Sequence, residues 1–249
     1  MTLTVILLAA GYATRLHPLT LDTPKPLLPL GEGVILDEIY AELPDNAKKI
    51  LVTNHRFAEQ FRRWRDDRGI AIEIVDDGTE TVETRLGAIR DLELARAQGR
   101  AEGDLLVVGT DNIFTWGLHG FLAKARRYAP APSVALWEAP SASAATQFGV
   151  VRRDAASRIV EFTEKSPDPP SREVAVCLYY FPEPMCGLIQ QFIDEGGSTD
   201  APGHFIKWLA ERGAVYGILM EGAWYDIGTI ETYETVLNTW QAEKGEKGR

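Results

Sequence analysis

The sequence predicts an α/β fold: a Rossmann-like, three-layer α/β/α arrangement around a mixed, mainly parallel sheet. Two observations lead to this prediction. Short, continuously apolar segments alternate with segments whose apolar residues recur at helical spacing, which is typical of parallel strands covered by helices on both faces. The chain has 249 residues, of which 45% are hydrophobic, enough for a sizeable core.

The first half of the chain supplies the parallel part of the sheet. Continuous apolar runs predict strands over 5–8 and 105–108, a short strand is predicted over 49–53, and alternation of Ile70, Ile72 and Ile74 predicts a fourth. Apolar residues three or four apart predict the intervening helices, over 34–43, 57–69 and 86–95.

The pattern changes after about Pro140. A hairpin is predicted around residues 154–156, followed by a strong strand and four further elements. Their ranges are 148–152 and 158–162 for the hairpin, 174–181 and 215–220 for strands, and 188–192, 205–209 and 230–240 for helices. We expect a single domain over 1–242, with a first half at about 1–140, a second part at about 141–228, and a flexible tail at 243–249.

Charge and composition exclude several classes of partner. The net charge of −10 argues against a general nucleic-acid or anionic-membrane surface, and no apolar run approaches the ~20 residues of a membrane helix. The beginning of the chain shows no leader pattern, so we expect a cytoplasmic protein. Cys177 and Cys186 are expected to be free thiols in a reducing compartment.

The segment after the first strand carries the strongest functional signal. Small residues, Ala9, Ala10 and Gly11, end the strand and let backbone N–H groups approach an anion closely. Arg15 and Lys25 add two positive charges to the same region. A strand, a turn of small residues and two cations predict a polyphosphate site.

These residues also carry a family resemblance. The stretch LLAAGYATRLHPLTLDTPKPLLPL resembles the N-terminal motifs of the sugar-1-phosphate nucleotidylyltransferases, L-A-[GA]-G-x-[GA]-T-R-L-x-P-L-T and P-K-[PA]-L-[LVI]-P. Ala10 and Ala13 stand where glycine is frequent in that family. The resemblance implies the nucleotide-diphospho-sugar transferase type of fold, nucleotide contacts at Ala9, Ala10, Gly11 and Tyr12, and catalytic roles for Arg15 and Lys25.

Two aspartates follow predicted strands far apart in the sequence. Asp111 lies in Gly109-Thr110-Asp111-Asn112, and Asp226 lies in Trp224-Tyr225-Asp226-Ile227-Gly228-Thr229. From the residues alone, Asp111 could equally be a turn residue and Asp226 could precede a helix capped by Thr229. In the resembled family these two positions together hold a catalytic Mg²⁺, a cation that favours carboxylate oxygens.

The second half resembles the part of the family that binds sugar phosphate. Phe148-Gly149-Val150-Val151 and Glu164-Lys165 match the segments that contact the sugar and its phosphate, which implicates Gly149, Glu164 and Lys165. Cys177 stands where many relatives have a glycine facing the sugar and could narrow that pocket. Asp200 could meet the sugar, but we expect it instead to cap the helix that follows it, and no histidine is assigned to catalysis.

Asp76-Asp77-Gly78 and residues 83–89 occupy the position of the family's base-reading segment, and the second of these stretches departs from the family form. Arg85 and Leu86 precede Gly87, where the family commonly reads G-T-A-G-A-[IL]. Gly87 is therefore a candidate nucleotide contact and equally a helix-packing glycine. The base, the sugar and the oligomeric state are left open by the sequence.

The implied reaction joins an NTP and a sugar 1-phosphate to give an NDP-sugar and pyrophosphate, with Mg²⁺. Three alternatives stay open: a nucleotidyltransferase for a small alcohol phosphate such as phosphocholine, a non-catalytic nucleotide-sugar-binding homologue, and a Rossmann dehydrogenase. The last is the weakest, because the G-x-G-x-x-G fingerprint is missing.

Overall fold

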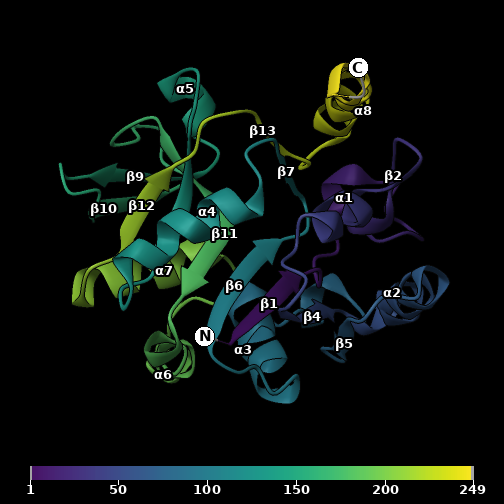
Figure 1. The fold of residues 1–249 in the computed structure, drawn as a ribbon, viewed down its shortest axis with the longest axis horizontal. Helices are drawn as coiled ribbons and strands as arrows, with labels where there is room; N and C mark the ends of the chain where they lie inside the picture. The colour runs from purple at the N-terminus through teal and green to yellow at the C-terminus, as the bar shows by residue number, and fades with distance from the viewer. Residues whose placement is uncertain (1, 248–249) are drawn as a thin grey trace.

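A nine-stranded mixed sheet forms the centre of the molecule, with helices on both faces (Figure 1). The computed structural model describes the backbone of residues 2–247 and the side chains of residues 2–240. The strands of the sheet are β1 (Leu3–Leu8), β4 (Lys48–Thr53), β5 (Glu73–Asp76), β6 (Asp104–Gly109), β8 (Ser133–Glu138), β9 (Gly149–Arg153), β10 (Ile159–Glu164), β11 (Glu173–Phe181) and β12 (Tyr216–Leu219). The order is β10-β9-β11-β6-β1-β4-β5, with β8 beside β11 and β12 beside β8. The predicted fold class is confirmed.

The first half of the chain builds a parallel block, because β1 pairs in parallel with both β4 and β6, and β4 pairs with β5. The strand predicted over 70–74 is displaced: β5 begins at Glu73, opposite Ile50 of β4. Ile72 is buried in the core from an irregular segment before the strand. The alternation of isoleucines therefore indicated buried side chains, whereas pairing with β4 determines where the strand lies.

Helices cover the two faces in two layers. One layer contains α1 (Ile35–Ala41), α2 (His55–Arg68) and α4 (Leu118–Ala125), and α8 (Ile230–Lys247) adds side chains to the same apolar cluster. The other contains α3 (Ala88–Gln98), α6 (Leu188–Asp194) and α7 (Pro202–Arg212). Successive residues of β1 point to opposite layers, since Leu7 packs in the first cluster and Ile6 in the second.

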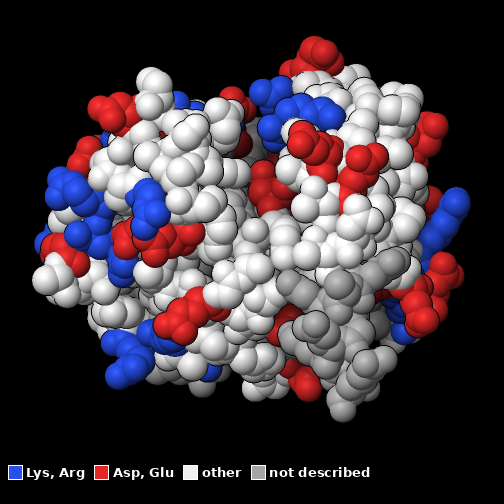
Figure 2. All heavy atoms as spheres, turned by 90° about the horizontal axis from the view of Figure 1, so that it is seen from above, with Lys and Arg blue, Asp and Glu red and all other residues white. Residues whose placement is uncertain are grey.

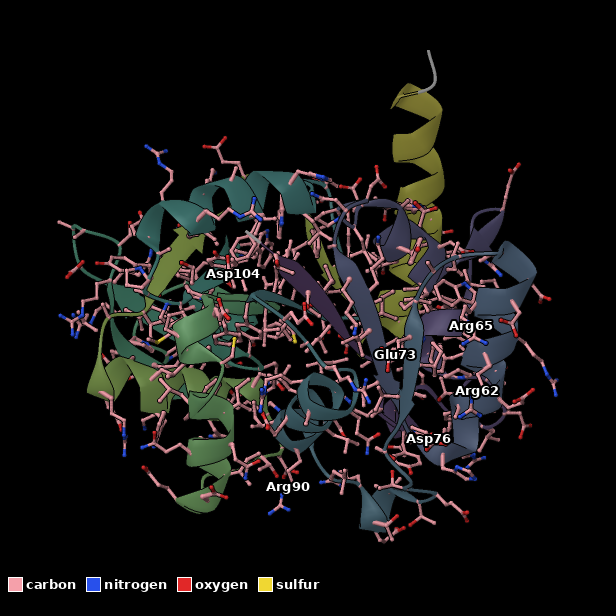
Figure 3. The ribbon with its side chains drawn as sticks, turned by 60° about the horizontal axis from the view of Figure 1, so that its bottom comes forward. Arg62, Arg65, Glu73, Asp76, Arg90 and Asp104 are labelled. Carbon is pink, nitrogen blue, oxygen red and sulfur yellow. The ribbon has the colours of Figure 1, made fainter. Side chains whose placement is uncertain are left out.

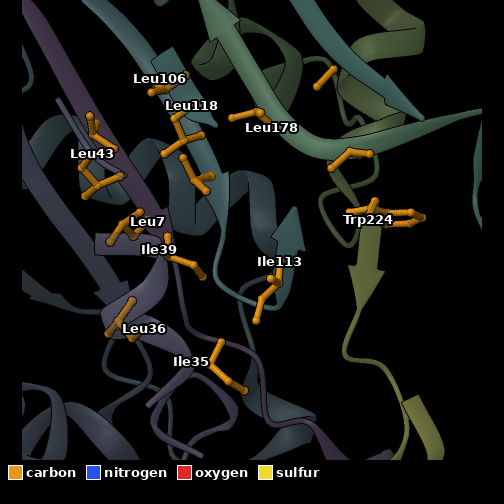
Figure 4. Close-up of a cluster of buried hydrophobic side chains, with 14 of the residues drawn as sticks. Leu7, Ile35, Leu36, Ile39, Leu43, Leu106, Ile113, Leu118, Leu178 and Trp224 are labelled. Atoms are coloured by element: carbon orange, nitrogen blue, oxygen red, sulfur yellow. The ribbon is translucent and has the colours of Figure 1, made fainter. Parts of the chain in front are cut away.

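The first apolar cluster ties the two halves of the chain together. Figure 4 shows Leu7 of β1, Leu106 of β6 and Leu178 of β11 close to Ile39 of α1 and Leu118 of α4. Four of these five side chains have no exposed surface, and Ile39 is 4% exposed. Burial of a leucine or isoleucine side chain contributes roughly 1.5–3 kcal/mol, so this packing fixes the strands whose ends carry the site.

The second half of the chain is mainly antiparallel. The predicted hairpin is confirmed as β9 and β10, and the long strand β11 pairs antiparallel with β6, β8 and β9. Neither α4 nor β8 was predicted, and the same holds for the short pair β7 (Asn112–Phe114) and β13 (Trp224–Asp226). Shorter elements complete the chain: β2 (Pro29–Leu30), β3 (Gly33–Val34), α5 (Ala142–Ala145), η1 (Thr14–Leu16), η2 (Lys25–Leu27), η3 (Val82–Thr84), η4 (Arg126–Tyr128) and η5 (Glu183–Met185).

The surface mixes charges of both signs. Figure 2 shows one face on which acidic and basic side chains lie interspersed among uncharged ones. Among the helices of the described residues, none is both long and apolar enough to cross a membrane. The tail predicted at 243–249 falls on residues whose side chains, and for 248–249 also the backbone, lie outside the described part.

Candidate active site

The site lies where β1 and β6 end. These neighbouring strands run parallel, so Leu8 and Gly109 reach the same edge of the sheet, the place where open parallel sheets gather ligand groups. Ala9 leads from β1 into the small-residue loop, and Thr110 leads from β6 to Asp111. The Thr110 hydroxyl donates to the Leu8 carbonyl at 2.7 Å, which joins the two strand ends.

The loop after β1 is fixed by hydrogen bonds to neighbouring residues and leaves space beside Gly11. The buried Asn54 donates from its amide nitrogen to the Ala10 carbonyl at 3.0 Å. Ala13 has a φ of 48°, in the left-handed region, and its carbonyl accepts from the Thr20 hydroxyl at 2.8 Å. A Cβ at Gly11 would meet no atom within 4 Å, so the packing leaves space beside the residue where the anion is predicted.

Tyr12 differs from its neighbours in this loop because its side chain is buried. Its phenolic oxygen lies 3.0 Å from the hydroxyl of Thr79, in the segment that follows β5. The loop after β1 is thereby connected to the segment in which the sequence predicts base recognition.

Lys25 and Asp111 form the centre of the charge cluster. Lys25 Nζ lies 2.8 Å from Asp111 Oδ2 and donates to the Ile227 carbonyl, also at 2.8 Å. Asn112 donates to Asp111 Oδ1 at 2.6 Å and accepts from the indole nitrogen of Trp224 at 2.7 Å. Asn112 was not predicted as a site residue; its place directly after Asp111 in the motif was the available signal.

Asp226 completes the cluster from β13, the strand paired with β7. Burial and the Asp111 carboxylate together raise the pKa of Asp226 to about 6, against the opposing charges of Lys25, Arg15 and Lys165. Burial also acts to raise the pKa of Asp111, but its attraction to Lys25 outweighs this and holds that pKa below its usual value. The structure therefore brings five of the six predicted charged site residues, all except Glu164, into one electrostatic cluster.

The two carboxylates fit a hard divalent cation. Asp111 and Asp226 offer carboxylate oxygens, and the mutual repulsion that raises the pKa of Asp226 is what a bound cation would relieve. Among the described residues, no three His, Cys, Asp or Glu side chains form a group that could enclose a metal. This suits Mg²⁺, which commonly takes one or two carboxylates together with water and substrate phosphate.

Glu164, at the end of β10, occupies a narrow space between two glycines. A Cβ on Gly149 would lie 2.9 Å from Glu164 Oε2, and a Cβ on Gly203 would lie 2.5 Å from it. Burial raises the pKa of Glu164, against the opposing charges of Lys165 and His204. Lys165 has a φ of 47°, a left-handed conformation that is unfavourable for a side-chain-bearing residue. Gly203 and His204 were missed, because only the fold brings α7 beside the hairpin.

Gly87 has a structural reason to be glycine. Its φ is 91°, and a Cβ there would lie 2.6 Å from the Thr199 carbonyl oxygen. Its nucleotide contact stays a prediction beside this packing role. The prediction that Asp200 caps α7 is wrong: Ala201 is the N-cap and has no side-chain cap, whereas Asp200 lies 3.5 Å from Arg85.

Cys177 lies in β11, next to the end of β6. Its Sγ is 2.9 Å from where a Cβ on Gly109 would stand, and burial raises the pKa of its thiol to about 12. The thiol is therefore neutral at physiological pH. Cys177 and Cys186 are both free, as predicted. That Cys177 narrows the acceptor pocket stays a prediction.

A cavity of about 720 Å³ lies elsewhere, at the edge where β6 begins. Asp104 and Tyr180 are among its lining residues, and none of the predicted site residues is. We therefore place the candidate site at the opposite edge of the sheet, where the charged cluster lies.

Comparison with known proteins agrees with this location. The family model described as "Nucleotidyl transferase" matches residues 4–243. The chain is 29% identical over 231 residues to the bifunctional protein GlmU of Methanocaldococcus jannaschii, covering 90% of this chain and 50% of that protein. It is 25% identical over 236 residues to the catalytic subunit beta of mannose-1-phosphate guanylyltransferase of Drosophila pseudoobscura pseudoobscura, covering 92% and 60%. The chain thus spans about half to three-fifths of the length of these curated relatives.

A solved structure shows the same fold. The crystal structure of UDP-glucose pyrophosphorylase complexed with UDP-glucose superimposes with a TM-score of 0.80 at 16% identity, covering 98% of this chain and 100% of that one.

Proposed function

Because the chain belongs to the nucleotidyl transferase family, we propose that it transfers a nucleoside monophosphate from an NTP to a sugar 1-phosphate, releasing pyrophosphate. One observation carries the proposal: the fold gathers Arg15, Lys25, Asp111, Lys165 and Asp226 into a single cluster. These residues come from five separate segments of the chain, and each belongs to a motif that is recognisable in the sequence.

The reaction asks little covalent chemistry of the protein. An oxygen of the acceptor phosphate attacks the α-phosphorus, a new P–O bond forms, and the bond to the β-phosphate oxygen breaks. The electron pair leaves with pyrophosphate. Since the substrates supply both nucleophile and leaving group, catalysis consists of positioning and charge neutralisation.

Arg15 and Lys25 serve the triphosphate. Arg15 is exposed on η1 beyond the open loop at Gly11, where its guanidinium can neutralise charge on the departing pyrophosphate. Lys25 is held by Asp111 and the Ile227 carbonyl, so its ammonium is fixed at the centre of the cluster, beside the predicted α-phosphate.

Asp111 and Asp226 would hold Mg²⁺. The cation would supply electrostatic stabilisation of the phosphate oxygens when bound. Asn112 restrains the Asp111 carboxylate through its 2.6 Å hydrogen bond, which keeps the other oxygen directed to the cluster.

Glu164 and Lys165 serve the acceptor. Lys165 contributes positive charge for the acceptor phosphate, and Glu164 presents a half-buried carboxylate, confined by Gly149 and Gly203, that can accept from a sugar hydroxyl. The intact cluster favours turnover over a binding-only homologue.

A matrix of substrates tests the proposal. The whole chain is incubated with Mg²⁺ and each of ATP, GTP, CTP, UTP and dTTP, against a set of sugar 1-phosphates and phosphocholine, and pyrophosphate release is recorded. We expect release that requires both substrates, with a sugar 1-phosphate as the best acceptor. Release only with phosphocholine would favour the alcohol-phosphate alternative, and binding without release for every pair would favour the non-catalytic one.

A further inference from the structure

Behind the loop that carries Gly87 lies a buried pair of carboxyl groups, Asp77 and Asp91. Asp91 lies in the first turn of α3 and is 6% exposed. Its Oδ1 has no hydrogen-bond donor among the described residues, and its carboxyl group lies within hydrogen-bonding reach of that of Asp77. Arg90, the preceding residue, points outward to solvent (Figure 3), so the helix directs Asp91 into the interior.

Two carboxyl groups this close share a proton, because two adjacent buried charges repel each other strongly. Asp77 is the ionised member, since its Oδ1 accepts from the Thr79 backbone N–H at 2.6 Å and its carboxylate also accepts from the Thr79 hydroxyl. Asp91 therefore holds the proton and donates it to Asp77. This accounts for the Oδ1 atom without a donor.

The pair connects directly to the loop after β1. The Tyr12 phenolic oxygen lies 3.0 Å from Thr79 Oγ1, and Thr79 in turn donates from its backbone N–H to Asp77. On the other side, the Asp91 backbone N–H donates to the Gly87 carbonyl at 3.0 Å. Asp91 thus contacts the segment of Gly87 directly and is linked to the loop after β1 through Asp77 and Thr79.

We propose that Asp91 is a positioning residue for the triphosphate: through Asp77, Thr79 and Tyr12, its proton holds the loop after β1 in the conformation that accepts phosphate. The proposal rests on the proposed function for the identity of the loop's ligand. Loss of the proton places a second negative charge beside Asp77, and the hydrogen-bonded chain to Tyr12 loosens.

Other charged groups that act on the carboxyl pair and on Tyr12 come from β5 and α2. Asp76 at the end of β5 acts on Asp77, and Arg56 of α2 acts on Tyr12. Asp76 itself contacts His55 at 2.8 Å and Arg62 at 3.6 Å, and Figure 3 shows Asp76 and Arg62 in the same part of the molecule.

Burial and the nearby Asp77 carboxylate raise the pKa of Asp91 to about 8. The network is accordingly intact at neutral pH and weakens as the pH rises through that value.

The test measures phosphate binding without turnover. Inorganic tripolyphosphate with Mg²⁺ is titrated calorimetrically into the whole chain at pH values on both sides of 8. The variants are Asp91→Asn, which keeps a neutral donor, and Asp91→Leu, which removes it. Asp104→Asn is the control, because it alters a buried aspartate at the opposite edge of the sheet, where Tyr180 and Glu183 bind it.

We expect the Kd of the wild-type chain to rise about fivefold more than that of Asp91→Asn between low and high pH, which corresponds to about 1 kcal/mol. The ratio of the two Kd values cancels the titration of tripolyphosphate and of the remaining protein groups. Asp91→Leu should bind weakly at every pH, and Asp104→Asn should follow the wild type. A pH-independent ratio, or wild-type affinity in Asp91→Leu, overturns the proposal.

A stability readout separates positioning from folding. The folded-state pKa of Asp91 lies above its unfolded value of 3.8, so the free energy of unfolding falls as the pH rises from about 4 to about 8. Asp91→Asn lacks this fall, and its melting temperature should exceed that of the wild type most at high pH. If Asp91→Leu loses stability but binds tripolyphosphate normally when folded, Asp91 is only structural.

The two proposals fail in different ways. If no substrate pair in the matrix releases pyrophosphate, the proposed function is wrong, but the tripolyphosphate titration can still be interpreted. Absence of tripolyphosphate binding by the wild type at every pH would overturn the positioning role, because the loop would then hold no phosphate.

Discussion

At the scale of single residues, the contact between Lys25 and Asp111 gives one lysine two duties. Its ammonium offsets the effect of burial, which acts to raise the pKa of Asp111, and in the proposed function it also faces the substrate phosphate. Arg15, by contrast, has an exposed side chain. The two cations of the N-terminal motif should therefore respond differently to removal.

We predict that Lys25→Ala lowers pyrophosphate release at least about 100-fold, the effect typical of deleting one electrostatic contact to a transition state. It should also destabilise the free protein by about 1 kcal/mol, because Asp111 loses its partner while keeping access to solvent. Urea unfolding and initial rates measure the two effects.

The double variant Lys25→Ala/Asp111→Asn separates them, because it should recover the lost stability without recovering activity. Arg15→Ala should lose rate at nearly wild-type stability. Equal losses of stability in Arg15→Ala and Lys25→Ala would contradict this division.

Lys165 is a charged residue with a strained backbone conformation. Its left-handed backbone, at a φ of 47°, costs about 1 kcal/mol in a residue with a side chain. Strain of this kind persists where a side chain is needed at a fixed position. The position therefore favours glycine for stability and, in the proposed function, lysine for binding the acceptor phosphate.

We predict that Lys165→Gly raises the free energy of unfolding by about 1 kcal/mol. It should also raise the KM for the acceptor about tenfold or more, through loss of a charge-assisted contact, with little change in the KM for NTP. Ser157→Gly is the matched control: Ser157 has a φ of 67° in the turn of the same hairpin. It should gain similar stability and keep wild-type kinetics. An acceptor KM unchanged in Lys165→Gly would remove Lys165 from the acceptor site.

The motifs identified residues better than they identified contacts. Arg15, Lys25, Asp111, Lys165 and Asp226 could be named from the sequence because each stands in a short local pattern. Their partners could not. Asn112, His204 and Asp91 acquire their roles from residues of other elements. The helical pattern does not reveal that Asp91 is buried, because an amphipathic helix commonly has carboxylates next to apolar residues in its sequence.

At the scale of elements, the long apolar segments were predictable and the short ones were not. β1 and β6 are buried along nearly their whole length, so their continuous apolar runs indicated strands. β7 and β13 have three residues each and exist because they pair with one another, although they lie far apart in the sequence. β5 shifted from its predicted range because the register with β4, and not the isoleucine pattern, fixes its ends.

Gly87 and Gly11 illustrate two different reasons for a glycine, close packing and close approach of a ligand. We predict that Gly87→Ala destabilises the protein by about 2 kcal/mol or more, because it combines a positive φ with a 2.6 Å clash at Thr199. Gly11→Ala should change stability by less than about 0.5 kcal/mol, since the space around it is empty. It should instead weaken binding of NTP, whose phosphates would occupy that space.

Gly78→Ala isolates the conformational effect, because Gly78 has a φ of 77° and no atom lies within 4 Å of where its Cβ would stand. Its loss of stability should be about 1 kcal/mol, smaller than that of Gly87→Ala. Urea unfolding of the three variants and calorimetric titration with tripolyphosphate provide the comparison. Normal binding by a folded Gly11→Ala variant would argue against phosphate at this loop.

At the scale of the whole molecule, the two substrates are assigned to different parts of one continuous sheet. The residues proposed for the triphosphate follow β1 and β6, those proposed for the acceptor lie on β9, at the end of β10 and directly after it, and β11 pairs with both β6 and β9 between them. Asp111, from the first half, and Asp226, from near the end of the chain, meet above this junction. A site made this way requires both parts to be folded at once.

We therefore predict that the chain unfolds in a single cooperative transition, as expected of the single domain 1–242. Calorimetry and tryptophan fluorescence should give the same midpoint, since Trp64 belongs to the first half and Trp224 to the second. Tyr180→Phe tests the junction, because the Tyr180 hydroxyl on β11 donates to the buried Asp104 at the start of β6, at 2.6 Å. Loss of this bond, worth about 1 kcal/mol, should lower the common midpoint by about 2–4 °C and leave the transition single. Two separated transitions in the wild type, or a shift of only one probe in Tyr180→Phe, would show that the halves fold independently.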